Sequence, residues 1–253
     1  MSSPNETPNK ADLADSIVDG AMRLAERQPW SSVRLSDIAA EAGVTLSQMR
    51  GVFDSKSAVL GGFVRRIDQA VLDGNDPEMA DEPARDRLFD VLMRRFEAMK
   101  PYRAALRSIA KAYRRDPLAI AGFNAQARRS MTWMLESAGI GTTGRMGTIR
   151  AQGLVFVMAR TLPVFLRDRD EGLARTMAAL DRALRDGEQV MRSMGSGFRL
   201  AGMVGSVIAG LRERARAEYD DANYDDPYGE PRDGDDPYGE ADERDEPWTG
   251  GPH

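Results

Sequence analysis

The chain has 253 residues, of which 42% are apolar, and its formal net charge at pH 7 is −5. It has no cysteine and a single histidine, His253, so the composition excludes disulfides and thiol nucleophiles and leaves little for histidine acid–base chemistry or zinc binding. We therefore expect a protein without a cofactor or enzymatic activity. We see no secretory signal and no run of about 18 apolar residues, which predicts a cytoplasmic location.

The N-terminal part predicts a polar leader followed by short helices. Residues 1–9 are polar and contain proline, which is typical of a disordered leader. Apolar residues then recur at helical spacing from Leu13 to Leu24, and this first helix is expected to end near Pro29. A second, shorter helix is expected to stop at Gly43.

Residues 41–56, EAGVTLSQMRGVFDSK, hold the most specific local pattern. Thr45 is expected to cap a third short helix, because its hydroxyl can accept from the backbone N–H of Gln48 while the Gln48 side chain reaches back. Asp54 is expected to cap a fourth helix that continues to Val71. A short helix, a turn containing glycine and a second short helix together predict a helix-turn-helix.

The second half of the chain predicts longer helices. Residues 73–83 are rich in Asp, Pro and Gly and are expected to form a linker. Beyond them, helices are predicted at 84–99, 102–115, 117–138, 145–167 and 170–193. Pro101 and Pro117 are placed to start helices, whereas Pro163 is expected to kink or end one. No segment alternates with a period of two, so the predicted fold class is all-α.

The C-terminal end is strongly acidic. Residues 218–253 carry 14 Asp or Glu and two Arg, a net charge of −12, which leaves +7 on residues 1–217. Proline, glycine and like charges with almost no aliphatic residues predict a disordered tail. The apolar, glycine-containing segment 198–211 and the arginines after it fit an interfacial helix, a dimer contact or a last core helix.

The run VRLSDIAAEAGVTLSQMRGVFDSKSAVL resembles the N-terminal domain of the TetR family of transcriptional regulators over about residues 11–72. The shared pattern is a helix ending in Ile-Ala-x-x-Ala-Gly-Val, a Ser or Thr cap, a short recognition helix, and Phe-x-Ser-Lys before a long fourth helix. The resemblance implies a TetR-like fold, with a DNA-binding helix-turn-helix domain at 10–72 and a helical domain at 84–217 that dimerises and holds an effector.

Carried onto this sequence position by position, the resemblance assigns DNA contacts to Arg34, Thr45, Leu46, Ser47, Gln48, Arg50 and Lys56. Lys56 is expected to meet a backbone phosphate, and Phe53 is expected in the core. Where the family usually has Tyr followed two residues later by Tyr or His, this chain has Arg50 and Val52. Arg50 can still pair with phosphate or guanine, whereas Val52 offers no donor.

The resemblance further implies a repressor that binds a pseudo-palindromic DNA operator as a homodimer and is released by a small apolar effector. The effector pocket is expected among Met131, Trp133, Met134, Phe156, Met158 and Phe165, although core packing also explains these residues. The helix pair 145–167 and 170–193 is the expected dimer interface.

A second interpretation keeps the fold without the DNA binding. Residues 128–185 loosely resemble the ubiquinone-biosynthesis accessory proteins, a lipid-binding family with a TetR-like fold. Residues 10–72 also carry eight basic and eight acidic side chains, whereas affinity for DNA rests largely on neutralising phosphates. The alternative is therefore a TetR-fold protein that binds lipid or a partner, with membrane contact as a less favoured partner.

Overall fold

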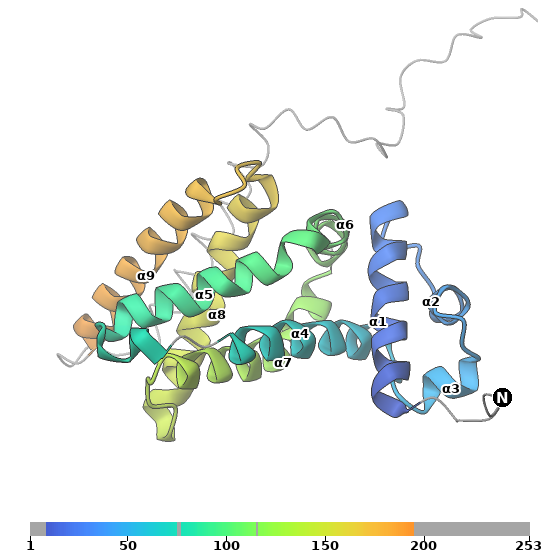
Figure 1. Cartoon of the computed structure of the whole chain (residues 1–253), viewed down its shortest axis with the longest axis horizontal. Coiled ribbons are helices and arrows are strands. Elements are labelled where there is room, and N and C mark those ends of the chain that lie inside the picture. The colour runs from blue at the N-terminus through green and yellow to red at the C-terminus, as the bar shows by residue number, and fades with distance from the viewer. Residues whose placement is uncertain (1–8, 75–76, 115, 195–253) are drawn as a thin grey trace, which may run out of the picture. The chain divides into compact units, whose positions relative to one another are not determined.

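The computed structural model describes residues 9–74, 77–114 and 116–194, which form helices and no strand (Figure 1). The α-helices are α1 (Lys10–Arg27), α2 (Leu35–Glu41), α3 (Leu46–Arg50), α4 (Lys56–Asp73), α5 (Ala84–Met99), α6 (Arg103–Arg114), α7 (Pro117–Ser137), α8 (Gly144–Arg167) and α9 (Ala174–Met194). Two 3-10 helices, η1 (Pro77–Asp81) and η2 (Lys100–Tyr102), precede α5 and α6. The predicted all-α class is confirmed. Residues 1–8, the segment 198–211 and the acidic tail 218–253 lie outside the described residues.

Local side chains decide where the first four helices begin. Thr45 caps α3 as predicted, and its side chain accepts a hydrogen bond from the backbone N–H of Gln48. The predicted cap of α4, Asp54, is wrong by one residue. Ser55 has an extended backbone, and its hydroxyl accepts from the N–H of Ala58 at 3.1 Å, so Ser55 is the cap. The Asp54 carboxylate instead accepts from the Ser55 hydroxyl.

Helices α1 and α4 approach each other closely at a glycine. A Cβ atom placed on Gly62 would lie 2.7 Å from Cζ of Phe53 and 3.0 Å from a methyl group of Val18. Phe53 is buried, as predicted, and its ring occupies the space that a larger residue at position 62 would need. The packing of Phe53 and of α1 against α4 therefore depends on the absence of a side chain at Gly62.

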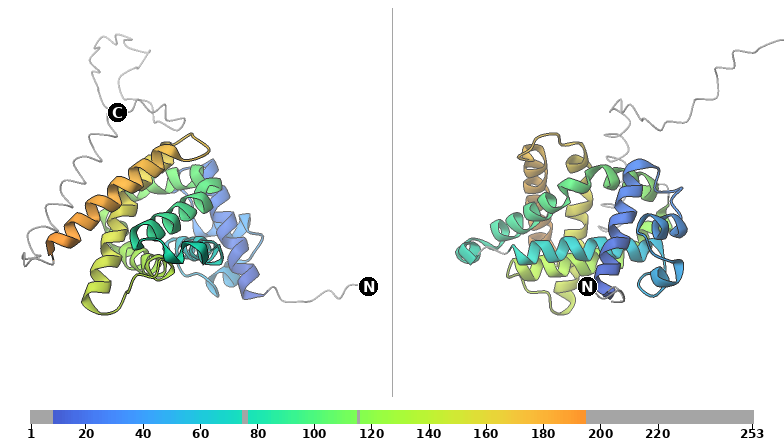
Figure 2. Two further views of the ribbon diagram at one scale, coloured as in Figure 1. Left: turned by 60° about the vertical axis from the view of Figure 1, so that its left-hand side comes forward. Right: turned by 45° about the vertical axis from the view of Figure 1, so that its right-hand side comes forward.

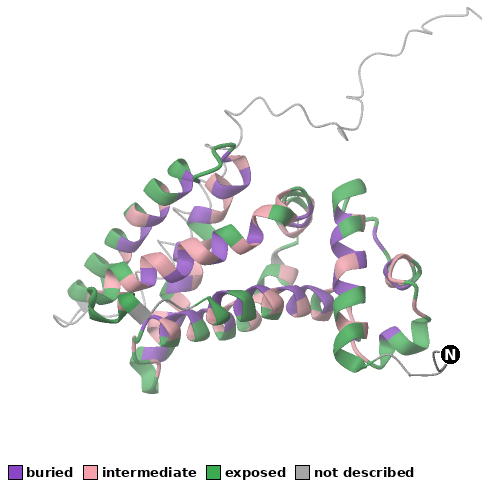
Figure 3. Cartoon of the chain, viewed as in Figure 1, coloured by how far each residue is buried: buried purple, intermediate pink, exposed green. Residues whose placement is uncertain are grey.

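Helix α4 belongs to two layers of packing. It lies against α1 on one side and against α5 and α7 on the other, while α8 packs between α7 and α9 (Figure 2). Buried positions line the faces where these helices meet, and exposed positions line the outer faces (Figure 3). One hydrophobic core runs through the described helices, from Ile17 in α1 to Leu184 in α9. The first four helices are thus held on the rest of the fold by α4 and by the packing of α1 on α6.

Helix α8 continues through its proline. Pro163 was expected to kink or end the helix; it lies inside Gly144–Arg167, so the predicted end is wrong, while the kink stays a prediction. Proline removes one backbone donor, and the carbonyl four residues earlier belongs to Ala159, which is exposed and can bond water. Beyond the proline, Phe165 and Leu166 are buried, and their burial favours continuing the helix. The composition of α8 would also suit a membrane span, but here it packs against neighbouring helices.

The turn between α8 and α9 explains why α9 starts at Ala174 instead of the predicted residue 170. The Asp168 carboxylate accepts hydrogen bonds from the hydroxyl and the backbone N–H of Thr176, both at 2.8 Å, and Asp170 accepts from the N–H of Ala174. Burial opposes charging of Asp168, but these hydrogen bonds hold its pKa below the ordinary value. Two carboxylates thus satisfy the first turn of α9.

A buried ion pair joins α4 to α5. Asp68 and Arg95 are 6% and 5% exposed, and their side chains are hydrogen-bonded to each other. The hydroxyl of Ser130, on α7, donates to the same carboxylate oxygen at 2.7 Å. Three helices therefore meet at one Asp68 oxygen, in surroundings where a lone charge is costly.

We predict that Arg95→Met lowers the free energy of unfolding by about 3–5 kcal/mol, because it leaves the Asp68 carboxylate buried without its partner. Urea unfolding followed by circular dichroism measures this loss. The double variant Asp68→Leu/Arg95→Met should recover most of it, because no charge is then left in the core.

A matched surface pair supplies the control. Arg160 and Asp186 are hydrogen-bonded at 2.6 Å, but both side chains are about half exposed. Arg160→Met should cost less than about 1 kcal/mol, as is usual for exposed ion pairs. Equal losses for Arg95→Met and Arg160→Met would show that the buried pair has no special role.

Candidate nucleic-acid interface

Helix α3 presents nearly all of its side chains to solvent. Thr45, Leu46, Ser47, Gln48 and Arg50 are exposed, whereas Met49 is 2% exposed and anchors the helix in the core. Val52 is half-buried and packs against that core, so this apolar side chain has a packing role at a position where the family usually has a hydrogen-bonding residue. Five of the seven predicted DNA-contacting residues thus lie together on one exposed, five-residue helix and its cap.

The turn that orients α3 depends on one glycine. Gly43 has φ +69°, a left-handed conformation that residues with a side chain rarely adopt. Its N–H donates to the carbonyl of Ala40, and the N–H of Val44 donates to that of Ala39 at 2.9 Å, which closes the end of α2. This is the glycine-containing turn that the helix-turn-helix pattern predicted.

A reciprocal capping box holds the first turn of α3. The Gln48 N–H donates to Thr45 Oγ1 at 3.1 Å, and the Thr45 N–H donates to Gln48 Oε1 at 2.8 Å. Both hydrogen bonds join backbone to side chain, so each residue satisfies a donor that the helix start would leave free. The predicted capping box is confirmed.

Helix α2 is clamped to α1 by a carboxylate between two arginines. Glu41 accepts from Arg23 Nε at 2.8 Å and lies 2.6 Å from a nitrogen of Arg27. Hydrogen bonds from Arg23 and then Arg27 hold the pKa of Glu41 below its ordinary value. The sequence does not predict this clamp, because Glu41 is 18 and 14 residues from Arg23 and Arg27 and no local pattern links them.

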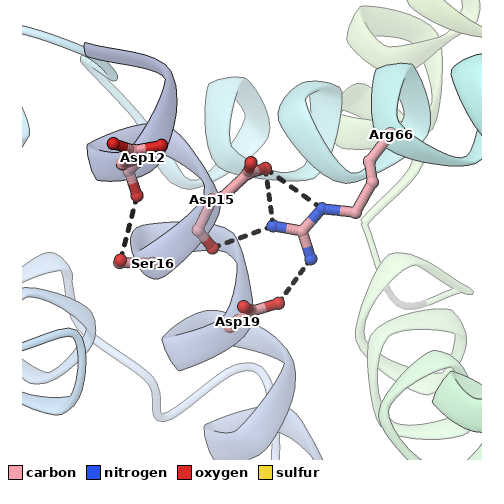
Figure 4. A network of polar contacts seen from close by, with 5 residues as sticks. All are labelled: Asp12, Asp15, Ser16, Asp19 and Arg66. Carbon is pink, nitrogen blue, oxygen red and sulfur yellow. Dashed lines mark hydrogen bonds and ion pairs between the residues drawn. The ribbon is translucent and has the colours of Figure 1, made fainter. Parts of the chain in front are cut away.

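Helix α4 is tied to α1 by Arg66 (Figure 4). Its guanidinium donates to the side chain and the backbone carbonyl of Asp15, at 2.9 and 2.8 Å, and is hydrogen-bonded to Asp19. A planar guanidinium that meets two carboxylates fixes the angle between the helices more firmly than a single contact would. Helix α1 therefore holds both α2 and α4, and α3 is joined to α1 through α2.

Lys56 has a structural role that the sequence did not indicate. Its ammonium donates to the carbonyl oxygens of Trp30 and Val33 at 2.6 and 2.7 Å, and lies 4.5 Å from the centre of the Trp30 ring. Burial lowers its pKa below the ordinary value, and the Asp37 charge opposes that shift. An ammonium has three donors, so one remains for the predicted phosphate contact, which stays a prediction.

The net charge of α1 to α4 does not tell how many of their basic side chains are available to a ligand, because some of these side chains are already held in ion pairs. Arg23, Arg27 and Arg66 are neutralised by carboxylates, and Lys56 holds carbonyls. Lys10, Arg34, Arg50 and Arg65 have no ion pair among the described residues, and all four are exposed. Arg34 immediately precedes α2 and Arg50 ends α3, so two of these free charges flank the helix-turn-helix.

The residues predicted to line an effector pocket are divided by the fold. Met131, Met134 and Phe165 are buried in the core, where the Phe165 ring lies 5.1 Å from that of Phe96. Phe156 and Met158 are half-buried on α8, and Trp133 is 58% exposed on α7. The structure thus does not bring the six side chains around one space, and the pocket stays a prediction.

Two cavities lie elsewhere among the described residues. One, of about 260 Å³, lies between η1, α5 and the end of α7, and Arg87 and Arg94 line it. The other, of about 380 Å³, lies at the turn between α8 and α9 and is lined by Arg167, Asp168, Arg169, Asp170 and Arg175. The second is lined by charged side chains and the first by apolar and polar groups in similar measure, and the described residues hold no cluster of metal-ligating side chains. The exposed surface of α3 is therefore the stronger candidate site.

We predict that Lys56→Ala lowers the free energy of unfolding by about 1.5–3 kcal/mol, the range for hydrogen bonds to a charged group, because two carbonyls lose their donor. The matched variant is Arg50→Ala, which removes an exposed cation without an ion pair and should change stability by less than about 0.5 kcal/mol. Thermal and urea unfolding of the two variants compare them directly. A stability loss as small for Lys56→Ala as for Arg50→Ala would contradict the structural role.

Comparisons with known proteins relate the fold to solved structures. The chain matches no protein-family model and no curated protein. The structure of a TetR transcriptional regulator from Nitrosomonas europaea is 24% identical with a TM-score of 0.55, and the match covers 70% of this chain and 98% of that one. TetR regulators from a Rhodococcus species and from Streptomyces coelicolor match at 18% and 15% identity with TM-scores of 0.49 and 0.46, over 70% and 81% of this chain and 95% and 91% of theirs.

Proposed function

We propose that this protein, which has the fold of TetR transcriptional regulators, is itself a DNA-binding transcriptional regulator. The observation that carries the proposal is helix α3, which exposes Leu46, Ser47, Gln48 and Arg50 while Met49 holds it in the core. A helix-turn-helix protein needs such a short, rigid helix, because the major groove is only about 12 Å wide. We further propose that the protein is a cytoplasmic, non-enzymatic repressor.

The distribution of charge supports this proposal despite the neutral total of residues 10–72. Most of the paired charges serve contacts between helices, as in the Arg66 and Glu41 clamps. The exposed guanidinium groups of Arg34 and Arg50 lie on either side of the turn between α2 and α3 and remain free for phosphates. Phosphate neutralisation supplies much of the affinity for DNA, so these two residues should matter more than the net charge suggests.

Selection of bound fragments from the genome that encodes the protein should recover a pseudo-palindrome with half-sites spaced on the order of 34 Å or a multiple of it. Arg50→Ala should weaken binding to that site by about 1–3 kcal/mol if it contacts guanine, or lower the salt slope by about one if it contacts phosphate. Fluorescence anisotropy over a range of salt concentrations separates the two results. The control is Arg129→Ala, an exposed arginine on α7 that should leave binding unchanged.

Failure to enrich any sequence would overturn the regulator and favour a second candidate, a protein of the same fold that binds lipid or an apolar partner. The observation behind that candidate is the exposure of large apolar residues on α7, where Leu118 is 84% and Trp133 is 58% exposed. Isolated exposed apolar residues are common on protein surfaces, so this observation supports the second candidate less strongly than the exposed side chains of α3 support DNA binding.

We propose a homodimer formed by α8 and α9. These helices pack on each other and expose Met146, Met177 and Val190, which a symmetric partner would cover. A two-fold axis would also match a palindromic DNA site.

Met177→Lys combined with Val190→Lys should convert the dimer to a monomer at micromolar concentration, because each lysine would place a charge in an apolar interface. Sedimentation velocity measures the change. Leu118→Lys, which places a lysine at a more exposed apolar position on α7, should leave the dimer intact. A wild-type protein that sediments as a monomer would contradict the dimer.

We also propose that a small apolar effector releases the protein from DNA. Of the six predicted pocket residues, we expect Phe156 and Met158 of α8 to contact the effector, because both are apolar and only half-buried. An effector can act only if it favours one arrangement of the two DNA-reading helices over the other.

A further inference from the structure

The capping box limits what Gln48 can recognise. The side-chain amide of glutamine has one oxygen that accepts and one nitrogen that donates two hydrogens. Because the backbone N–H of Thr45 must meet an acceptor, the atom 2.8 Å from it has to be Oε1. The oxygen is thereby turned back toward the helix start, and Nε2 is left with no hydrogen bond among the described residues.

This geometry separates Gln48 from the usual glutamine contact to adenine. That contact is bidentate: the side-chain oxygen accepts from the adenine N6 amino group while the nitrogen donates to N7. In Gln48 the Thr45 N–H occupies one lone pair of Oε1 and fixes the direction of the amide, so that hydrogen bond would have to tilt for both ends of the amide to meet one adenine. Nε2 is the end of the side chain that has no partner, and it is the end arranged to meet a base.

Leu46 is the second unusual residue of this turn. It is 56% exposed and is the first residue of α3, directly after the cap. It is absent from the core and from the half-buried residues that pack against it, whereas Met49 supplies the apolar anchor of the same helix. Packing thus gives no reason for a leucine at this position, which lies where a recognition helix approaches the bases.

We propose that the first turn of α3 reads two neighbouring features of the major groove: Leu46 contacts the C5-methyl group of a thymine, and Gln48 donates from Nε2 to an acceptor on guanine, adenine or thymine. The thymine methyl is the apolar group on the major-groove edge, and guanine N7 and O6, adenine N7 and thymine O4 are acceptors. Cytosine offers a donor there and is excluded at the Gln48 position. This inference rests on the proposed DNA-binding function.

The thymine contact is tested on the sequence enriched by selection with the full chain. Each thymine is replaced in turn by deoxyuridine, which removes only the methyl group. At one position per half-site the wild type should lose about fourfold in affinity, the factor that corresponds to about 0.8 kcal/mol for one buried carbon group. Leu46→Ala should bind the thymine and deoxyuridine sites equally. Indifference of the wild type to every replacement, or an equal loss in Leu46→Ala, would overturn the Leu46 contact.

The donor contact is tested with Gln48→Glu. Glutamate keeps an oxygen for the Thr45 N–H and so preserves the capping box, but it has no donor and accepts from the cytosine N4 amino group instead. Repeating the selection should move one position of each half-site to cytosine, with an unchanged melting temperature. An unchanged preference would overturn the donor role of Gln48.

Different results would overturn the DNA-binding function and the two base contacts. If the wild type enriches no sequence, the DNA-binding function itself is overturned, and the base contacts with it. If a sequence is enriched but the deoxyuridine and Gln48→Glu experiments change nothing, DNA binding stands and the assignment of Leu46 and Gln48 falls.

Discussion

The geometry of the molecule depends on helix α4, which is shared by two packing layers. At its start, Lys56 holds the carbonyls of Trp30 and Val33, and in the next turns Arg66 grips two aspartates of α1. Toward its end, Asp68 is bonded to Arg95 of α5 and to Ser130 of α7. A movement of α5 or α7 would therefore also move α4, because the buried Asp68 carboxylate cannot be separated from Arg95 without a large cost in free energy. Helix α4 would in turn transmit this movement to α1 and α3.

A second connection runs through α6. The Ser108 hydroxyl accepts from the N–H of Trp30 at 2.9 Å and donates to the carbonyl of Gln28 at 3.2 Å, so α6 holds the chain between α1 and α2. The rings of Phe63 and Tyr102 meet edge to face, 5.0 Å apart, beside it. Helices α4 and α6 thus contact the segment between α1 and α2 from two sides, so its orientation depends on how these two helices lie relative to each other. An effector that alters their relative position would thus change the presentation of α3 without contacting it.

Local patterns in the sequence predicted local structure well. The capping box of Thr45 and Gln48, the turn at Gly43 and the proline at the start of α7 each depend on residues within four positions, so the printed sequence holds all the information. The misplaced cap of α4 is an error of one residue between the adjacent Asp54 and Ser55, and the start of α9 was predicted four residues too early. Which of several possible caps is used depends on backbone angles that the pattern does not encode.

Contacts between distant residues were the part that the sequence could not supply. Lys56 fits the family pattern as a phosphate ligand, and only the structure shows that two carbonyls 23 and 26 residues away occupy its ammonium. Likewise, the spacing of Met131, Met134 and Phe165 suits a core and a pocket equally, and their burial places them in the core. Helical periodicity reports that a face is apolar but not what covers it.

Because α4 packs both against α1 and against α5 and α7, it also limits where chimeras of such proteins can be joined. The Asp- and Pro-rich stretch after residue 72 suggests a fragment ending there as a unit to fuse to the C-terminal helices of another protein. The inner face of α4 contradicts this: Phe63, Ile67 and Val71 are buried there beside Asp68. Cut away, that face would expose an apolar stripe and an aspartate that has lost its arginine. Exchange between such proteins would keep a folded chain only if the donor brings α5 and α7 together with α4.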